Sequence, residues 1–178
     1  TRPDDRMLHR LRARIGVVFA GSALVSRISA IENGELTLLQ HTHVRPGEAR
    51  DTARELLAEV GLSVDDATTP DQLTRAGRRL VALARALALR PPLLLLDEPT
   101  LGLDPHSAAQ LDATIRRLQD ANGFGLLIFS NEVRHAFGLA DHIYVVGEGR
   151  IVAHGDRDAL MQSRHALVRS LLHRRGSP

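Results

Sequence analysis

The stretch "LLLLDEPTLGLDP", Leu93 to Pro105, decides the fold of this 178-residue chain. Its four leucines form a short apolar run that is typical of a buried strand, and the run delivers two adjacent carboxylates, Asp97 and Glu98, into a turn. Asp104 then matches a helix N-cap, with proline at the first helical position. In a parallel sheet the carboxyl ends of the strands form the ligand edge, so the pattern predicts a site at Asp97 and Glu98.

Strands and helices alternate on both sides of this stretch. Strands are predicted at Ile15 to Phe19, Leu93 to Leu96, Leu126 to Ser130, Ile143 to Val146 and Ile151 to Ala153. Helices are predicted at Met7 to Arg14, Pro46 to Val60, Arg75 to Leu89, Pro105 to Asp120 and Val133 to Leu139, and from Asp158 onward. The segment after the first strand is interpreted as a turn and a polar connection. Because strands alternate with helices, we expect a parallel α/β sheet, and the apolar strand "IGVVF" suits cover on both faces.

Composition narrows the class of protein. With 43% hydrophobic residues the chain is long enough for one domain with a proper core, and it has neither an apolar run of membrane-spanning length nor a signal-peptide core, so we expect a cytoplasmic protein. The absence of cysteine excludes disulfides and thiolate zinc sites. All 23 basic residues are Arg, which a coding bias explains. A phosphate loop of the form GxxxxGK[ST] needs a Lys, which this chain lacks.

Three other features of the sequence are candidate binding sites. A pI near 10.2 and clustered Arg invite a nucleic-acid hypothesis, but the net charge is only +2 and aromatic residues are 3%, so we expect no nucleic-acid partner. His41 and His43 lack the neighbouring Cys or carboxylates of a metal site and are interpreted as a solvated loop. The C-terminal "HRRGSP" is interpreted as a solvated helix end and tail, with weak attraction to an anionic membrane as the alternative.

Three motifs together resemble those of ATP-binding-cassette (ABC) ATPases. "LLLLDEPTLGLDP" is similar to the family's Walker B motif and D-loop, and "QLTRAGRRLVALARALALRP" is similar to its signature helix. "LLIFSNEVRHAFGLADHIYVVGEGRIVAHGDRDAL" is similar to its switch strand and closing pattern. The resemblance runs from about Arg12 to Met161. It implies a P-loop NTPase-like core that lacks the N-terminal strands and the phosphate loop, hence a chain incomplete at its N-terminus.

The resemblance also implies a division of this single partial domain. Residues 30–90 are expected to form a helical subdomain with the signature-like helix. Residues 91–160 are expected to run from Walker B through the C-terminal part of the sheet, and residues 161–178 to form the C-terminal helix and tail.

Roles follow for three acidic residues that match the family's motifs. Asp97 matches the Walker B carboxylate that holds the Mg²⁺ shell, since a hard cation prefers oxygen ligands. Glu98 matches the general base that orients the attacking water. Asp104 matches the D-loop aspartate, which in the family contacts a second subunit across a dimer. The alternative for the adjacent pair is a strand-end turn with a helix cap.

The signature-like turn departs from the family's pattern. Thr74 keeps the hydroxyl of the family's Ser, but Arg75, Ala76 and Gly77 stand where the family has Gly-Gly-Gln. Glycine there lets backbone N–H groups approach a γ-phosphate closely, so Arg75 is expected to obstruct that approach. Bidentate binding of phosphate by its guanidinium is the alternative.

Two further positions that contact the γ-phosphate side of the family's site are changed. Ala20 replaces the Q-loop Gln, and a methyl group cannot link Mg²⁺ and water to a membrane partner. Asn131 replaces the switch His; it can donate a hydrogen bond to a phosphate oxygen but cannot carry a charge. We therefore predict that the chain alone does not hydrolyse ATP.

The resemblance implies the ATP-binding subunit of an ABC transporter, with ATP and Mg²⁺ as cofactors. Its partners would be transmembrane permease subunits and a second ABC ATPase subunit, placing it at the cytoplasmic face of the membrane. "SGALVSRISAIEN" and "LLQHTHVRPGEARDTARELLAEVGL" resemble segments of Mla/Mce-type ATPases, which suggests lipid as cargo. The alternatives are a non-catalytic degenerate subunit that acts as a regulatory or scaffold partner, and a non-functional fragment.

Overall fold

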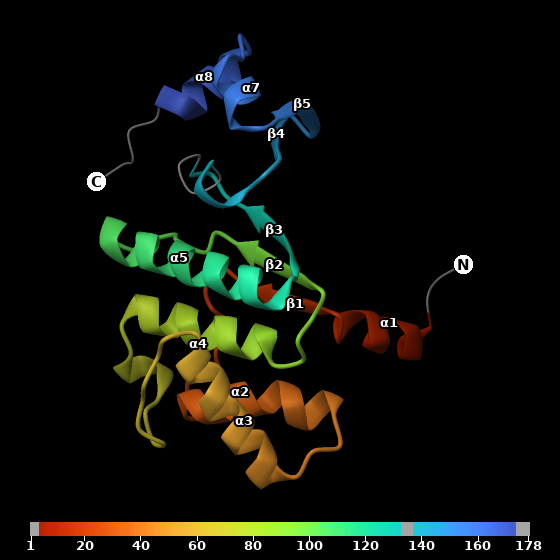
Figure 1. Ribbon diagram of the computed structural model, residues 1–178, viewed down its shortest axis with the longest axis vertical. Coiled ribbons are helices and arrows are strands. Elements are labelled where there is room, and N and C mark those ends of the chain that lie inside the picture. Colours follow the sequence, from red (N-terminus) through yellow and green to blue (C-terminus); the bar gives the residue numbers. More distant parts are fainter. Residues whose placement is uncertain (1–3, 133–136, 174–178) are drawn as a thin grey trace. The chain divides into compact units, whose positions relative to one another are not determined.

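The computed structural model describes residues 4–132 and 137–173, which belong to two compact units, Thr1–Phe129 and Ser130–Pro178 (Figure 1). The first unit contains α1 (Asp5–Arg12), β1 (Ile15–Val18), α2 (Ala30–His41), α3 (Pro46–Glu59), η1 (Pro70–Gln72), α4 (Arg75–Leu87), β2 (Leu93–Asp97), α5 (Pro105–Asn122) and β3 (Gly125–Phe129). The second contains β4 (Ile143–Gly147), β5 (Arg150–Gly155), α7 (Arg157–Met161) and α8 (Ala166–His173). The predicted division into residues 30–90, 91–160 and 161–178 stays a prediction.

The first unit is built on a parallel three-stranded sheet in the order β1-β2-β3, as predicted. The central strand pairs Leu94 with Gly16 of β1 and with Leu126 of β3, and it pairs Asp97 with Phe129. The carboxyl ends of all three strands therefore lie at one edge of the sheet. The last residue of the central strand, Asp97, lies at that edge.

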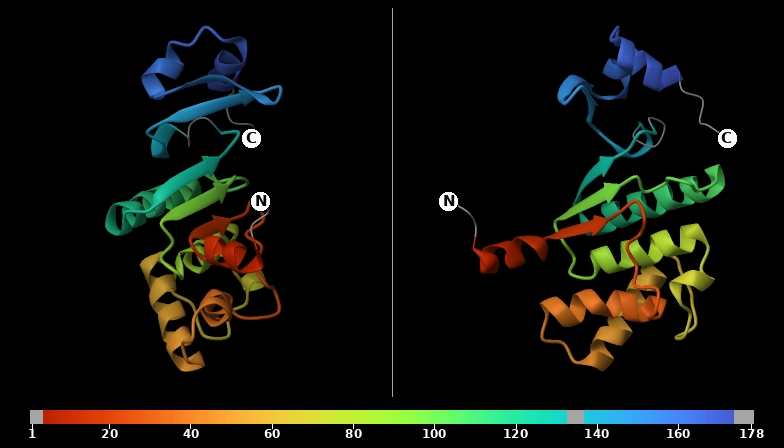
Figure 2. Two further views of the ribbon diagram at one scale, coloured as in Figure 1. Left: turned by 90° about the vertical axis from the view of Figure 1, so that its right-hand side faces the viewer. Right: turned by 180° about the vertical axis from the view of Figure 1, so that it is seen from behind.

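The two faces of this sheet differ in burial. The face that carries Val18, Leu94 and Leu96 packs against α4 and α5 and is almost fully buried. On the opposite face Leu127 and Phe129 remain 46% and 55% exposed. The right-hand view of Figure 2 shows the three strands of this unit with no helix in front of them. Among the described residues the second face is half-buried at β1, where "IGVVF" suggested full cover, and is exposed at β3.

Close backbone contact fixes α4 against β1. A Cβ atom at Gly16 would lie 2.5 Å from the carbonyl oxygen of Ala86 on α4 and 2.9 Å from a methyl carbon of Leu94. The strand and the helix can approach this closely because Gly16 has no side chain. α4 is buried at Val81 as well as at Leu83, which lie on opposite sides of the helix, so α4 is covered on more than one face.

A helical layer of α2, α3 and α4 completes the core of this unit. The helix predicted from Pro46 to Val60 is confirmed as α3, and its apolar residues Ala53, Leu56, Leu57 and Val60 are at most 4% exposed. A Cβ atom at Gly34 of α2 would lie 3.1 Å from that of Ala53, so the two helices are in close contact.

The helix α2 lies where the sequence was interpreted as a polar connection, and that interpretation was wrong. Ser29 and Glu32 form a capping box that starts the helix. Asn33 is fully buried, and its side chain accepts from Val25 N–H and donates to the carbonyls of Val25 and Ser29. It thus provides hydrogen-bond partners for backbone groups of Val25 and Ser29. The polar residues Ser29, Glu32 and Asn33 therefore form the hydrogen-bonded start of α2 rather than a loop.

The second unit is a β-hairpin with two short helices. β4 and β5 pair in antiparallel register through a turn in which Glu148 and Gly149 both have positive φ. Val145, Leu160 and Val168 form its buried core. The single helix predicted from Asp158 is two helices, α7 and α8, since α7 ends at Met161. The predicted helix from Val133 to Leu139 lies largely outside the described residues.

No helix within residues 4–132 and 137–173 has both the length and the apolar character needed to cross a bilayer.

Candidate functional site

The site starts at the carboxyl end of the central strand. Asp97 ends β2 half-buried, and Glu98 follows with a φ of 44° while its N–H donates to the Phe129 carbonyl at 2.9 Å. A positive φ in a non-glycine residue costs about 1 to 2 kcal/mol and is typical of functional turns. The strand edge thus holds two adjacent carboxylates in a fixed, strained turn.

This donor set fits a magnesium ion better than a zinc ion. Mg²⁺ is commonly bound by one or two carboxylates together with waters and phosphate oxygens. Asp97 and Glu98 supply such carboxylates. Within the described ranges no cluster of three or more His, Asp or Glu side chains forms a complete protein cage for a metal. The strand edge is therefore suited to a cation that arrives with a phosphate ligand.

Asp104 begins the next helix, as predicted. Its carboxylate accepts from the N–H groups of His106 and Ser107 at 3.0 Å and from the Ser107 hydroxyl at 2.5 Å. The hydrogen bonds from Ser107 hold the pKa of Asp104 below its ordinary value. Asp104 is thus an ionised N-cap of α5 in this chain.

The four signature-like positions lie together at the start of α4. Thr74 is the N-cap, and its hydroxyl oxygen accepts from Gly77 N–H at 3.1 Å. Arg75 is exposed and its Nη1 donates to the Gly102 carbonyl at 2.8 Å, while Ala76 is half-buried. A Cβ atom at Gly102 would lie 2.0 Å from Arg75 Nη1, so any side chain at this position would displace the guanidinium. The Arg75 side chain therefore binds the turn after β2 of its own chain.

The remaining predicted positions are placed differently. Ala20 is half-buried in the loop after β1, within the same unit as the carboxylates. Asn131 is exposed and belongs to the second unit. The first unit therefore brings together the signature-like turn, the carboxylate turn and the Ala20 loop, but it does not contain the switch position.

A buried arginine, Arg79, was missed as a site residue. It is 3% exposed, and its Nη1 donates to the Phe19 carbonyl at 2.8 Å and to the Ser22 hydroxyl at 3.2 Å. Desolvation by burial, followed by the neighbouring charges of Arg75 and Arg78, lowers its pKa. A signal was available in the sequence, because Arg79 stands four residues before Leu83 on the apolar face of its helix.

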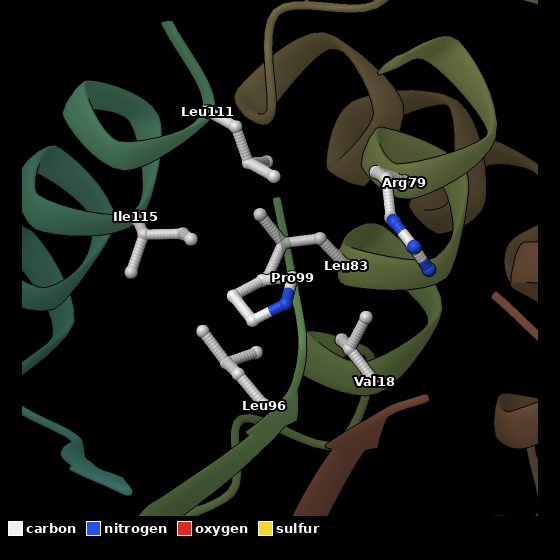
Figure 3. Close-up of a pocket in the computed structure, with 7 residues that line it drawn as sticks. All are labelled: Val18, Arg79, Leu83, Leu96, Pro99, Leu111 and Ile115. Carbon is white, nitrogen blue, oxygen red and sulfur yellow. The ribbon is translucent and has the colours of Figure 1, made fainter. Parts of the chain in front are cut away.

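A small cavity lies between α4, α5 and the sheet (Figure 3). It is lined by Val18, Arg79, Leu83, Leu96, Pro99, Leu111 and Ile115. Its volume of about 10 Å³ corresponds to a single water molecule, so it is no nucleotide pocket. Neither Asp97 nor Glu98 lines this cavity, which is therefore separate from the carboxylate turn.

The sequence matches the family model for ABC transporters over residues 1–101, which is more than half of the chain. The chain therefore belongs to the ABC transporter family, and the predicted resemblance is confirmed.

Similar proteins have several transport roles. The chain is 33% identical to the intermembrane phospholipid transport system ATP-binding protein MlaF of Haemophilus influenzae, across 94% of this chain and 63% of that protein. It is 36% identical to the methionine import ATP-binding protein MetN 1 of Rhodococcus jostii, across 92% of this chain and 48% of that protein. The chain thus spans about two thirds of the first of these relatives and about half of the second.

A solved structure has the same fold. The ATP-binding cassette MJ0796, determined as a dimer in a post-hydrolysis state with ADP and Pi, superposes with a TM-score of 0.76 at 28% identity. The match covers 87% of this chain and 68% of that one. The α/β ABC ATPase fold predicted from the sequence is therefore confirmed.

Proposed function

We propose that this chain is part of the ATP-binding subunit of an ABC transporter and couples ATP binding and hydrolysis to transport. The observation that carries the proposal is the pair Asp97 and Glu98, held in a strained turn at the carboxyl end of the central parallel strand. Family membership over residues 1–101 supports the same assignment. We place the working subunit at the cytoplasmic face of a membrane, bound to permease subunits and to a second cassette.

In this proposal the chain's own residues have separate tasks. Asp97 provides an oxygen ligand for Mg²⁺, and Glu98 orients the attacking water and takes its proton. Mg·ATP, when bound, supplies the phosphoryl group that water attacks. Thr74, the N–H group of Ala76 and Asp104 are assigned to the phosphate surface that faces the partner cassette. Asn131 stays a predicted hydrogen-bond donor to phosphate. Because this chain has no Lys for a phosphate loop, we expect no turnover from the 178-residue chain alone.

The test uses the protein as it exists, in its assembled complex. Epitope-tagged chain would be purified from detergent-solubilised membranes of its own host, and Mg²⁺-dependent ATP hydrolysis measured. We expect the complex to contain a membrane permease and a second cassette, and Glu98→Gln to lower turnover by about 100-fold, the range for loss of a general base. Glu55→Gln, an exposed change on α3, is the matched control and is expected to leave turnover unchanged.

The second candidate function is a non-catalytic partner of a competent cassette. Two positions favour it. Arg75 stands where the family has glycine, and its guanidinium donates to the Gly102 carbonyl. Ala20 stands where the family has Gln. Under this alternative the complex hydrolyses ATP, but Glu98→Gln in this chain changes the rate less than about 2-fold, within the usual effect of a surface substitution. A complex without any permease or second cassette would contradict both candidates.

A lipid cargo is the finer part of the proposal. It is supported by the similarity to MlaF, an intermembrane phospholipid transport system ATP-binding protein. The similarity to a methionine import protein has comparable strength. Mass spectrometry of small molecules retained by the purified complex would decide: phospholipid supports the proposal, and a polar solute without lipid overturns it.

A further inference from the structure

The loop that follows β1 is held in an unfavourable backbone conformation. Ser22 and Ala23 are consecutive residues with φ values of 64° and 47°, a region that residues with a Cβ rarely adopt. Two successive left-handed residues of this kind persist only when surrounding contacts fix them. The contacts that fix them must therefore be strong and specific.

Two arginines of α4 make those contacts. Arg85 donates from Nη1 to the Ala23 carbonyl at 2.8 Å and from Nη2 to the Ser22 carbonyl at 3.0 Å. Arg79 donates to the Phe19 carbonyl at 2.8 Å and to the Ser22 hydroxyl at 3.2 Å. Guanidinium forks of this type hold two acceptors in fixed geometry. The loop after β1 is thus bound to α4 at both of its strained residues.

The turn after β2 is bound by arginines of the same helix. Arg75 donates to the Gly102 carbonyl at 2.8 Å, and Arg79 Nη2 lies 3.5 Å from the carbonyl of Leu101, the preceding residue. Arg75 and Arg79 are four residues apart, so both reach from one face of α4. Arg79 consequently contacts both the loop after β1 and the turn after β2.

Arg79 is poorly explained as a stabilising residue. It is 3% exposed, its Nε has no hydrogen-bond partner among the described residues, and its Nη atoms donate to neutral oxygens. The charge of Asp97 opposes only part of the lowering of the Arg79 pKa that burial causes. A buried charge with such partners is costly, and an apolar side chain would fill the same space beside Leu83 and Leu96. Figure 3 shows the Arg79 side chain extending from α4 among the apolar residues that line the small cavity. Its retention at this position suits a coupling role better than a packing role.

We infer that Arg79 is a positioning residue that couples the loop of residues 19–23 to the turn of residues 99–103. Displacement of one segment changes the other through a single buried guanidinium. The loop of residues 19–23 contains Ala20. The turn of residues 99–103 connects Glu98 with Asp104. All of these contacts lie within the first unit, and the coupling does not depend on nucleotide hydrolysis.

The test is residue-resolved amide hydrogen exchange on the full chain. Ser22 N–H, bonded to the Phe19 carbonyl, reports on the loop, and Leu101 N–H, bonded to the Glu98 carbonyl, reports on the turn. In Arg79→Met both amides are expected to exchange about 10-fold faster or more, since each segment loses hydrogen bonds from the guanidinium. Core amides of β2 serve as the reference for global unfolding and are expected to change less.

Two single-contact variants separate coupling from simple loosening. Arg85→Met removes bonds to the loop alone and is expected to speed exchange at Ser22 about 10-fold and at Leu101 about 3-fold, the latter by transmission. In the Arg79→Met background Arg85→Met is expected to leave Leu101 unchanged, because the link is gone. Arg79→Lys keeps the charge with a single-point donor and is expected to protect one segment but not both.

The outcomes are distinguishable even when Arg79→Met folds poorly, because Arg79→Lys gives an independent measurement. Loss of coupled exchange with intact β2 protection supports the inference. Equal acceleration of all amides, or an effect of Arg85→Met on Leu101 that survives without Arg79, overturns it.

Discussion

Removing the amide of Asn33 is expected to destabilise the first unit far more than removal of a comparable surface amide. Asn33 is fully buried, and three of its hydrogen bonds are 3.0 Å or shorter, two to Val25 and one to the Ser29 carbonyl. A net value of about 1 kcal/mol per bond, discounted because Val25 is exposed and open to water, gives about 2 to 3 kcal/mol for Asn33→Ala.

Urea denaturation followed by far-ultraviolet circular dichroism measures this loss, with the dependence on urea checked for a constant slope. Asn122→Ala is the matched control: its amide also donates to a helix carbonyl, that of Leu118, but the side chain is exposed, and a loss below about 1 kcal/mol is expected. A loss below about 1 kcal/mol for Asn33→Ala as well would refute the assignment of Asn33 as the residue that fixes the start of α2.

Two other substitutions test the turn after β2 and the surface ion pairs. Gly102→Ala places a Cβ atom 2.0 Å from Arg75 Nη1 at a φ of 71°, so it is expected to displace this guanidinium and to lower the free energy of unfolding by about 1 to 2 kcal/mol; a crystal structure of the variant with the Arg75 contact unchanged would contradict this. Asp66 accepts hydrogen bonds from Arg54 and Arg50, which lower its pKa below the usual 3.8. Its contribution to stability is therefore present above that value and is lost as the pH falls through the lower pKa of the folded state. The difference in urea midpoint between the natural chain and Asp66→Asn should accordingly shrink on going from neutral pH to about pH 3, and a constant difference would contradict the ion-pair assignment.

Gly123→Ala is the control for Gly102→Ala. Gly123 has nearly the same φ, 70°, but a Cβ atom there would meet nothing within 4 Å. The strain of a positive φ is common to both variants, so the extra loss at Gly102 reports on the Arg75 contact alone.

The parts of the fold that were predictable are those set by local sequence. Four leucines before Asp97 indicated the central strand. The residues next to Asp104 indicated a helix cap, and those after Pro46 indicated the helix α3. These features depend on side chains within a few positions of each other. They could be predicted because hydrophobic periodicity and capping are local properties.

The rest depends on contacts between distant residues. The segment around Asn33 was interpreted as a polar connection between elements. Sequence alone could not show that Val25 and Ser29 would provide hydrogen-bond partners for the Asn33 amide. Arg79 contacts Phe19, 60 residues away, and a guanidinium in an arginine-rich helix carries no sign of that partner. The site residues were therefore predicted as a set of motifs, while the arginines that hold the loops around them became evident only from the structure.

The uneven cover of the parallel sheet has a consequence for the behaviour of the purified chain. Leu127 and Phe129 project from β3, the outer strand of the order β1-β2-β3, and about half of each side chain meets water. An outer strand with exposed apolar side chains is a template on which further copies assemble. Turbidity that grows with concentration would then come from folded molecules adhering through this strand, and a charged substitution at Leu127 would clear the solution without altering thermal unfolding.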